Sequence, residues 1–307
     1  MSIQVDMESL LLEVLTETSS SASEGKVASY IPELSKADPS LAGVAVMTPD
    51  GLFQAGDSSH PFTLQSISKI ITLMAALEQR GVEEVFARVG SEPTGDPFNS
   101  IVKLETAEHK PLNPMINAGA IAVCSLIPGS SVEERFSIIL EMLEAILGRT
   151  VQIDQAVYTS EKETGHRNRA LAYFLKDTGV LEGDVEEVLD LYFQQCSILV
   201  DCTDLARIGM FLAAKGITWS GQRLVSASIV RLVTTFMVTC GMYNASGEFA
   251  IQVGIPAKSG VSGGILGAVP GRFGIGTFGP ALDPKGNSVI GVKMLRELSH
   301  RLDLSIF

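Results

Sequence analysis

The chain has 307 residues, which corresponds to about two average domains or to one large two-lobed unit. It carries 23 Lys and Arg against 35 Asp and Glu, a formal net charge of −12. This acidic excess repels phosphate backbones and anionic membrane surfaces, so neither nucleic acid nor membrane is an expected partner. Apolar residues make up 46% of the chain, enough for a buried core, yet no run reaches the length of a membrane-spanning helix.

The cysteines and histidines indicate the compartment and exclude the common metal sites. The four cysteines contain no CxxC pair and are too few for a disulfide framework. No basic segment followed by an apolar core opens the chain, so we expect reduced thiols and a cytoplasmic location. The four histidines show no HxxxH or HExxH spacing, and no metal or other cofactor is expected.

The first 80 residues predict two helices, a hairpin and a third helix. Apolar periodicity predicts helices over residues 6–17 and 24–36, with a break at the Ser-rich stretch 19–23. The strand-like runs 42–47 and 52–55 flank a Pro-Asp-Gly turn, which is typical of a β-hairpin. Apolar residues at spacings of three and four then predict a helix over 63–79.

The remainder is mostly helical until glycine becomes frequent. The helices predicted there cover residues 132–147, 167–176, 185–196 and 203–215. Eight glycines between positions 254 and 276 separate short apolar runs, so residues 248–292 are predicted to form strands joined by tight turns. A final amphipathic helix is predicted over about 292–302.

Strands at both ends of the chain, with helices between them, predict an α+β fold. We expect residues 1–307 to form a single two-lobed catalytic domain. Approximately residues 1–62 and 240–307 would build an α/β lobe with an antiparallel sheet. Approximately residues 63–239 would form a mostly helical lobe inserted between its two halves.

The strongest local motif is Ser66-Ile67-Ser68-Lys69 at the start of an apolar helix. Residues three apart lie on one helix face, so Lys69 can reach the Ser66 hydroxyl. A serine needs a neighbouring proton acceptor before it becomes a nucleophile, and a buried lysine with a lowered pKa can serve. Because Ser-x-x-Lys also occurs by chance, a purely structural helix start stays open for this motif alone.

A second motif, Lys258-Ser259-Gly260, lies within the glycine-rich region. A Lys-Ser/Thr-Gly triplet on a strand is the third element of serine β-lactamases and penicillin-binding proteins. Glycine there allows the backbone to approach a ligand closely. An ordinary strand-to-turn junction is the alternative, but the pair of motifs with helices between them favours a serine acyl-transfer site.

Three further groups of polar residues are candidates for substrate binding. Asn117 could present a carboxamide to a ligand or cap a helix. Glu161 could hold an ammonium group and Asn168 a carboxylate or amide, or both could belong to a solvated helix start. Tyr192 and Tyr243 could belong to the core, or act as general bases if a neighbouring lysine lowers their pKa.

Taken together, these motifs resemble the serine-dependent, β-lactamase-like L-glutaminases. The resemblance covers about residues 24–295, with the motifs in the same order. The segments that carry it are Gly25–Pro32, Gln65–Lys69, Asn113–Ile121, Tyr192–Ser197, Cys240–Tyr243 and Pro256–Val261. It implies the serine β-lactamase and penicillin-binding-protein fold, hydrolysis of L-glutamine to L-glutamate and ammonia, and no cofactor. It also implies a homodimer or homotetramer.

The resemblance assigns roles residue by residue. Ser66 matches the nucleophile, Lys69 its activating partner, Tyr243 the general base and Tyr192 the other active-site tyrosine. The backbone N–H groups of Ser66 and Val261 match the oxyanion hole. The substrate contacts map onto Tyr30, Gln65, Ser66, Asn117, Glu161, Asn168, Tyr192, Tyr243 and Val261.

One residue departs from the family pattern, and two other functions compete. Asn244 stands where many members carry Asp, which removes a charge beside the matched base. A penicillin-recognising enzyme would share the fold, but the expected lack of export and of a Ser-Asp-Asn motif disfavours it. A metabolite-binding module without catalysis would have no need for Ser66 and Lys69 together.

Overall fold

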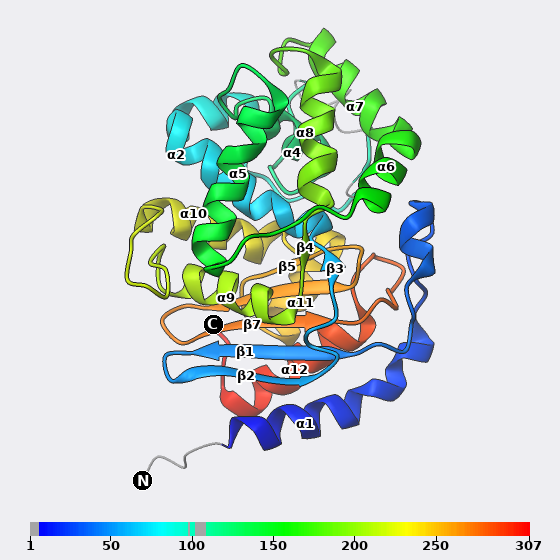
Figure 1. Ribbon diagram of the computed structural model, residues 1–307, viewed down its shortest axis with the longest axis vertical. Coiled ribbons are helices and arrows are strands. Elements are labelled where there is room, and N and C mark those ends of the chain that lie inside the picture. Colours follow the sequence, from blue (N-terminus) through cyan, green and yellow to red (C-terminus); the bar gives the residue numbers. More distant parts are fainter. Residues whose placement is uncertain (1–5, 98, 102–108) are drawn as a thin grey trace.

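The computed structural model describes residues 6–97, 99–101 and 109–307. A five-stranded sheet with flanking helices forms one part of the molecule, and a group of helices packs above it (Figure 1). The strands are β1 Gly43–Thr48, β2 Gly51–Gly56, β3 Phe62–Thr63, β4 Leu199–Val200, β5 Ala257–Ser259, β6 Gly264–Val269 and β7 Phe273–Phe278.

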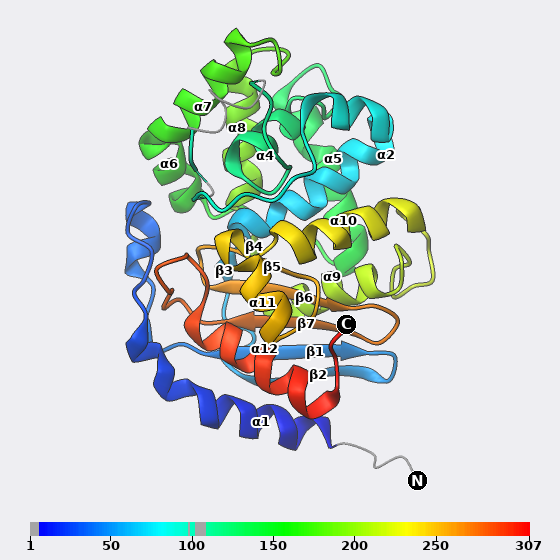
Figure 2. The ribbon, with the colours of Figure 1, turned by 180° about the vertical axis from the view of Figure 1, so that it is seen from behind.

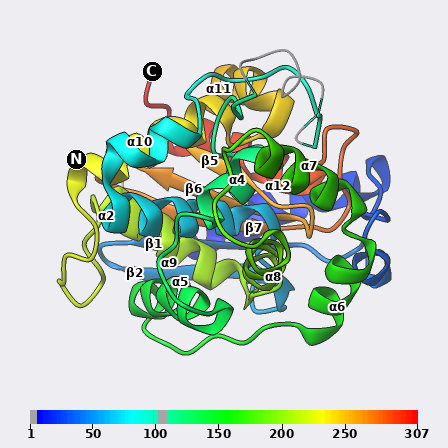
Figure 3. The ribbon, with the colours of Figure 1, turned by 90° about the horizontal axis from the view of Figure 1, so that it is seen from above.

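The helices of the sheet part are α1 Met7–Thr18, α9 Cys202–Ala213, α11 Ser246–Gln252 and α12 Val289–Leu302. The remaining α-helices are α2 Ser68–Arg88, α4 Asn117–Cys124, α5 Val132–Leu147, α6 Gln155–Thr164, α7 His166–Asp177, α8 Val185–Cys196 and α10 Ala227–Cys240. Short 3-10 helices are η1 Ser19–Glu24, η2 Pro32–Lys36, η3 Gln65–Ile67 and η4 Tyr243–Ala245. Figure 3 shows the upper helices from above.

The sheet is antiparallel, with the strand order β2-β1-β7-β6-β5, so it joins the two ends of the chain. Val46 of β1 pairs with Ile275 of β7, and Lys258 of β5 pairs with Leu266 of β6. The separate pair β3 and β4 lies between this sheet and the upper helices. The sequence that follows β3 enters η3, which contains Ser66, and then α2, which contains Lys69 of the same Ser-x-x-Lys motif.

Helices cover both faces of the sheet, and all six residues of β1 are accordingly buried. Val44 and Val46 pack with α1 and α12, whereas Ala45 and Met47 belong to the large core that includes α9. This alternation follows from the strand period of two. Figure 2 shows α11 and α12 on the face of the sheet opposite α9.

The glycines of the sheet have a specific structural reason, because they let α9 lie directly on β6 and β7. A Cβ atom at Gly274 would lie 2.0 Å from the Ala206 carbonyl oxygen, and one at Gly276 would lie 2.2 Å from the Cys202 oxygen. Conversely, a Cβ atom at Gly209 of α9 would lie 2.2 Å from the Gly267 oxygen. Backbone packs against backbone here, so no side chain larger than hydrogen fits.

The structure confirms the hairpin and most predicted helices, and it corrects three segments. Residues 24–36 are not one helix, because η1 ends at Glu24, Lys26 pairs with Leu282 in an isolated bridge, and only Pro32–Lys36 is helical after that. The Ser-rich break at 19–23 is itself the 3-10 helix η1. The region predicted as strands from residue 248 begins with the helix α11 instead, because the prediction rested on the glycines that follow this helix. Within the described residues, no helix is long and apolar enough to cross a membrane.

The close packing of α9 predicts that Gly274→Ala destabilises the fold. The new methyl group would overlap three backbone atoms of α9 that cannot move independently, with an expected loss of about 1–3 kcal/mol in the free energy of unfolding. Urea unfolding followed by circular dichroism measures it. Gly247→Ala in α11 is the matched control, since nothing lies within 4 Å of its added Cβ and the helix should gain roughly 0.5–1 kcal/mol. Equal stability of the two variants would contradict this packing account.

Candidate active site

Ser66 lies at the junction between β3 and α2. The residue before it, Gln65, has φ of 50°, a left-handed conformation that costs a non-glycine residue about 1–3 kcal/mol. This turn places Ser66 in the first turn of the helical segment, where backbone N–H groups lack helical partners. Both side chains are buried, Ser66 at 7% exposure. The strained turn therefore presents the Ser66 hydroxyl at the start of a helical segment.

Lys69 is almost completely buried near Ser66, at 1% exposure. Its Nζ atom donates to Asn117 Oδ1 at 2.7 Å and to the Met115 carbonyl oxygen at 3.2 Å. Burial lowers the pKa of Lys69 to about 8, although nearby Cys196, Cys124 and Glu161 oppose this shift. A substantial fraction of the amine is therefore neutral near pH 8 and able to accept a proton.

The Asn-Pro-Met-Ile-Asn-Ala-Gly motif contains both residues whose oxygen atoms accept hydrogen bonds from Lys69, namely Met115 and Asn117. Asn113 Oδ1 accepts from the backbone N–H groups of Met115, at 3.0 Å, and Ile116, at 3.2 Å. This turn fixes the Met115 carbonyl oxygen against the lysine. At Gly119, a Cβ atom would lie 1.9 Å from the Asn113 carbonyl oxygen, which explains the small residue.

Asn117 does not cap α4, because it is the first residue of the helix and Ile116 occupies the capping position. The capping alternative is therefore wrong. Its side chain instead accepts from Lys69 and donates from Nδ2 to Asn168 Oδ1 at 3.0 Å. Asn168, on α7, is half-buried.

Tyr243 approaches Ser66 from the other side, after α10 ends. Its φ of 54° is again left-handed, and its hydroxyl donates to the Ser259 carbonyl oxygen at 3.0 Å while also contacting the Ser66 side chain. Burial raises the pKa of Tyr243 and of Tyr192. The idea of a tyrosine with a lowered pKa is therefore wrong, and both tyrosines are neutral phenols near pH 7.

The Lys-Ser-Gly motif contacts Tyr243 through the Lys258 side chain and the Ser259 carbonyl oxygen. Lys258 is fully buried, donates from Nζ to the Ser259 carbonyl oxygen at 2.8 Å, and lies 4.5 Å from the Tyr243 ring centroid. Burial lowers the pKa of Lys258 far below its usual value, with Lys69 adding to the shift. The same carbonyl oxygen thus accepts from Lys258 and Tyr243, which fixes the phenol relative to β5.

Val261 follows this motif and is buried next to the Ser66 turn. A Cβ atom at Gly260 would lie 2.8 Å from the Leu64 carbonyl oxygen, so the two backbone segments touch. Within the described part of the chain, the Val261 N–H donates to no other group. A second N–H donor is therefore available near Ser66.

Glu161, on α6, is a further buried carboxyl group near this cluster, at 5% exposure. Burial raises its pKa to about 7, while a hydrogen bond with Gln65 and the charge of Lys69 act in the other direction. Tyr30 is 55% exposed as a whole residue, but burial of its hydroxyl raises its pKa, followed by the effects of Glu161 and Tyr243. Burial raises the pKa of Tyr192 as well, and Cys196, Glu161 and Tyr30 add to this rise.

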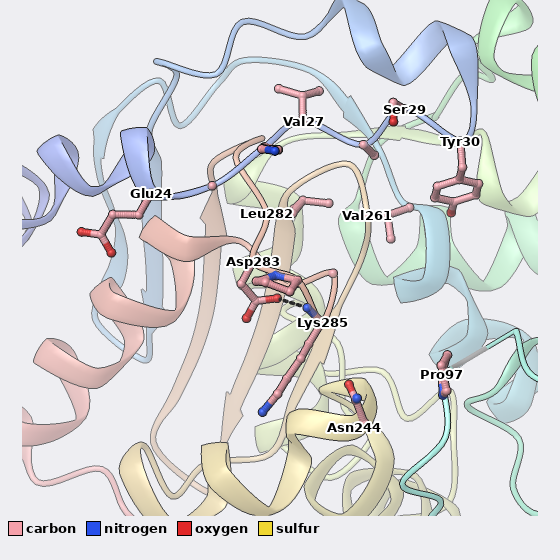
Figure 4. A pocket seen from close by; sticks show the side chains of 15 residues that line it. Glu24, Val27, Ser29, Tyr30, Pro97, Asn244, Val261, Leu282, Asp283 and Lys285 are labelled. Carbon is pink, nitrogen blue, oxygen red and sulfur yellow. Dashed lines mark hydrogen bonds between the residues drawn. The ribbon is translucent and has the colours of Figure 1, made fainter.

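A cavity of about 570 Å³ borders this cluster at Tyr30 and Val261. Figure 4 shows Tyr30 and Val261 along one side, with Pro97 and Asn244 across from Tyr30. Ser66 and Lys69 do not line it. Asn244 is exposed in this cavity and therefore lies on the approach to the cluster, beside the buried Tyr243.

The structure connects the candidate residues through contacts that sequence motifs alone could not supply. The Asn113 turn, the Met115 carbonyl oxygen and the thiols of Cys124 and Cys196 around Lys69 were missed by residue-type reasoning. Asn113 and Met115 lie within a recognised motif, so that motif was the available signal. Among the described residues, no group of three or more His, Cys, Asp or Glu side chains could hold a metal ion.

A sheet flanked by helices, with a Ser-x-x-Lys helix start and a Lys-Ser-Gly strand, defines a protein of the β-lactamase-like fold. The glutaminase family model matches residues 25–307, and the chain belongs to this family. A glutaminase from Clostridium botulinum strain Loch Maree is 57% identical over 98% of this chain and 100% of its own. Glutaminase 2 of Clostridium perfringens is 53% identical with the same coverage.

Solved structures of glutaminases share the fold closely. A Bacillus glutaminase determined in the presence of 4.3 M NaCl has a TM-score of 0.92 and 42% identity, covering 98% of this chain and 100% of its own. The covalent complex of a Bacillus subtilis glutaminase with 5-oxo-L-norleucine, formed from 6-diazo-5-oxo-L-norleucine, has a TM-score of 0.91 and 41% identity with the same coverage.

The raised pKa of Glu161 predicts that Glu161→Gln stabilises the protein at alkaline pH. A carboxyl group whose pKa is raised contributes stability that is lost as pH rises from about 4.5 to about 7, because the fold must then hold a buried charge. The gain in the free energy of unfolding should be on the order of 3 kcal/mol at pH 8 and less than about 1 kcal/mol at pH 5. Urea unfolding at both pH values measures it.

Glu187→Gln is the control, because the Glu187 side chain is 48% exposed and lies 3.7 Å from Arg135 in a long ion pair. Its stability should change little at either pH. If Glu161→Gln is no more stable than wild type at pH 8, the buried Glu161 carboxylate does not lower the free energy of unfolding, and the raised pKa is contradicted.

Proposed function

We propose that this protein hydrolyses the side-chain amide of L-glutamine to L-glutamate and ammonia through a covalent intermediate on Ser66. The observation that carries this proposal is the buried Lys69 amine, with a pKa of about 8, one helical turn from Ser66. Membership of the glutaminase family supports the substrate. The cavity that borders the cluster at Tyr30 and Val261 is where we expect an amino acid to enter.

In the first step, neutral Lys69 accepts the Ser66 proton as Oγ attacks the carboxamide carbon. The tetrahedral oxyanion is stabilised by the backbone N–H groups of Ser66 and Val261. Collapse of this intermediate breaks the C–N bond, and the departing nitrogen takes up a proton and leaves as ammonia. A γ-glutamyl ester on Ser66 remains.

Tyr243 is placed to relay that proton rather than to act as a phenolate. Its hydroxyl contacts Ser66 and is anchored on the Ser259 carbonyl oxygen, and burial keeps its pKa high. A neutral phenol can receive one proton while giving up another, which suits transfer to the leaving nitrogen. In the second step, water attacks the ester and the same network returns the proton to Ser66.

The substrate's charged groups match the polar residues around the cleft. The Glu161 carboxylate suits the α-ammonium group, and binding a cation would favour its ionised form. The amides of Asn117 and Asn168 suit the α-carboxylate, because they donate without changing protonation. Tyr30, Gln65 and Tyr192 complete the cleft wall.

The location and assembly of the protein stay predictions from the sequence. We expect a single two-lobed domain in the cytoplasm that assembles as a homodimer or homotetramer. Light scattering after size-exclusion chromatography measures the assembly.

The nucleophile assignment predicts that Ser66→Ala abolishes ammonia release from L-glutamine and leaves the fold intact. Removal of the attacking oxygen eliminates the covalent step, so the loss should be about 10⁴-fold or more. A coupled ammonia assay measures turnover, and thermal unfolding checks the fold. Wild-type protein should release ammonia from L-glutamine and leave the β-lactam nitrocefin intact. Turnover by the alanine variant would refute the assignment.

The lowered pKa of Lys69 predicts that kcat rises with pH to a plateau above about pH 8. Below that value the amine is protonated and cannot accept the Ser66 proton. The Glu161 carboxyl, with a pKa of about 7, should in addition make KM fall as pH rises through 7. Steady-state kinetics from pH 5.5 to 9.5 measures kcat and KM separately and so distinguishes the effect of Lys69 from that of Glu161. A kcat independent of pH over this range would contradict the role of Lys69.

A further inference from the structure

Helix α6 carries Glu161 but has little apolar packing to hold it. Of its ten residues, only Val157 and Glu161 are buried. A carboxylate removed from water tends to shift toward solvent unless its backbone is fixed. On α6 that fixation comes from polar contacts, because the helix buries too little apolar surface to supply it.

Asp190, on α8, makes the densest of these polar contacts. Its Oδ1 atom accepts hydrogen bonds from the Tyr158 hydroxyl and from Lys162 Nζ, both at 2.5 Å and both from α6. Its Oδ2 atom accepts from Gln194 Nε2 at 2.8 Å, one turn further along α8. Lys162 Nζ also donates to the Tyr158 hydroxyl at 3.1 Å, so the network closes on itself.

The residues of this network are close in sequence to two of the proposed substrate-binding residues, Glu161 and Tyr192. On α6, Tyr158 and Lys162 lie on either side of Glu161 in sequence, and on α8, Asp190 precedes Tyr192 by two residues. The two helices lie side by side in the upper part of the molecule (Figures 1 and 3). Successive helical residues point about 100° apart, so fixing one face of α6 also fixes the direction of Glu161.

We propose that Asp190 is a positioning residue that aligns α6 with α8 and so places Glu161 to bind the substrate's α-ammonium group. The proposal rests on the function proposed above and deepens it. Exposed ion pairs contribute little, but the Asp190 side chain is only 19% exposed and binds three donors at once. Charge-assisted bonds of this kind fix geometry as well as adding energy.

The test is Asp190→Asn, which keeps the shape of the side chain and removes its charge. The substrates are L-glutamine and 4-carbamoylbutanoate, which has the same amide but no α-amino group. The ratio of their kcat/KM values should fall about tenfold through a higher KM for glutamine, since small misplacements of binding groups have effects of this size. The kcat for glutamine should change less than about twofold.

Two controls separate positioning from general damage to the helical region. Glu187→Gln removes another ion pair of the same helix, to Arg135 of α5, which carries no cleft residue. It should leave the substrate ratio unchanged. In a Glu161→Gln background, Asp190→Asn should lower the ratio no further, because its effect acts through Glu161.

Each outcome supports or overturns the proposal. The proposal is supported if Asp190→Asn lowers the ratio in the wild-type background but does not lower it further in the Glu161→Gln background. An unchanged ratio, or equal loss for both substrates, overturns it. If Asp190→Asn does not fold, Tyr158→Phe removes only one hydroxyl of the network and should lower the ratio by a smaller factor. No ammonia release by the wild-type protein would refute the proposed function instead, which distinguishes the two failures.

Discussion

The site depends on the burial of one amine, Lys69 Nζ, between the Asn117 amide oxygen and the Met115 carbonyl oxygen. An isolated ammonium group is costly to remove from water, so the protein reduces that cost by lowering the lysine pKa to about 8. The two oxygens still bind the amine, which fixes its position while leaving it able to gain or lose a proton. The Asn113 turn and the close contact at Gly119 exist to hold those oxygens.

The same region contains other features that lower the free energy of unfolding. Glu161 is buried with a pKa of about 7, and Gln65 and Tyr243 adopt left-handed backbone conformations on either side of Ser66. Such strain persists only where surrounding structure enforces it. Here the enforcement comes from the sheet covered on both faces, the backbone contact of α9 with β6 and β7, and the polar network between α6 and α8. The rigid parts of the fold thus hold a strained and poorly solvated site.

Periodicity predicted the regular elements well because their burial patterns are strong, as in the hairpin around Asp50 and the helix α8. It failed over residues 24–36, where the chain is held by long-range pairing of Lys26 with Leu282, which no local pattern encodes. The motifs located the Ser66 and Lys69 pair, and the family resemblance supplied the other cleft residues. The protonation states were beyond sequence, since the raised pKa of Tyr243 and the lowered pKa of Lys69 follow from burial.

The central claim is that Lys69 activates Ser66, and covalent labelling tests it most directly. A Bacillus subtilis relative forms a covalent complex with 5-oxo-L-norleucine on reaction with 6-diazo-5-oxo-L-norleucine. This reagent should modify the peptide that contains Ser66 in the wild-type protein, as seen by mass spectrometry after digestion. A folded Lys69→Met variant should be labelled far more slowly. Labelling at another residue, or equally fast labelling of that variant, would contradict the account.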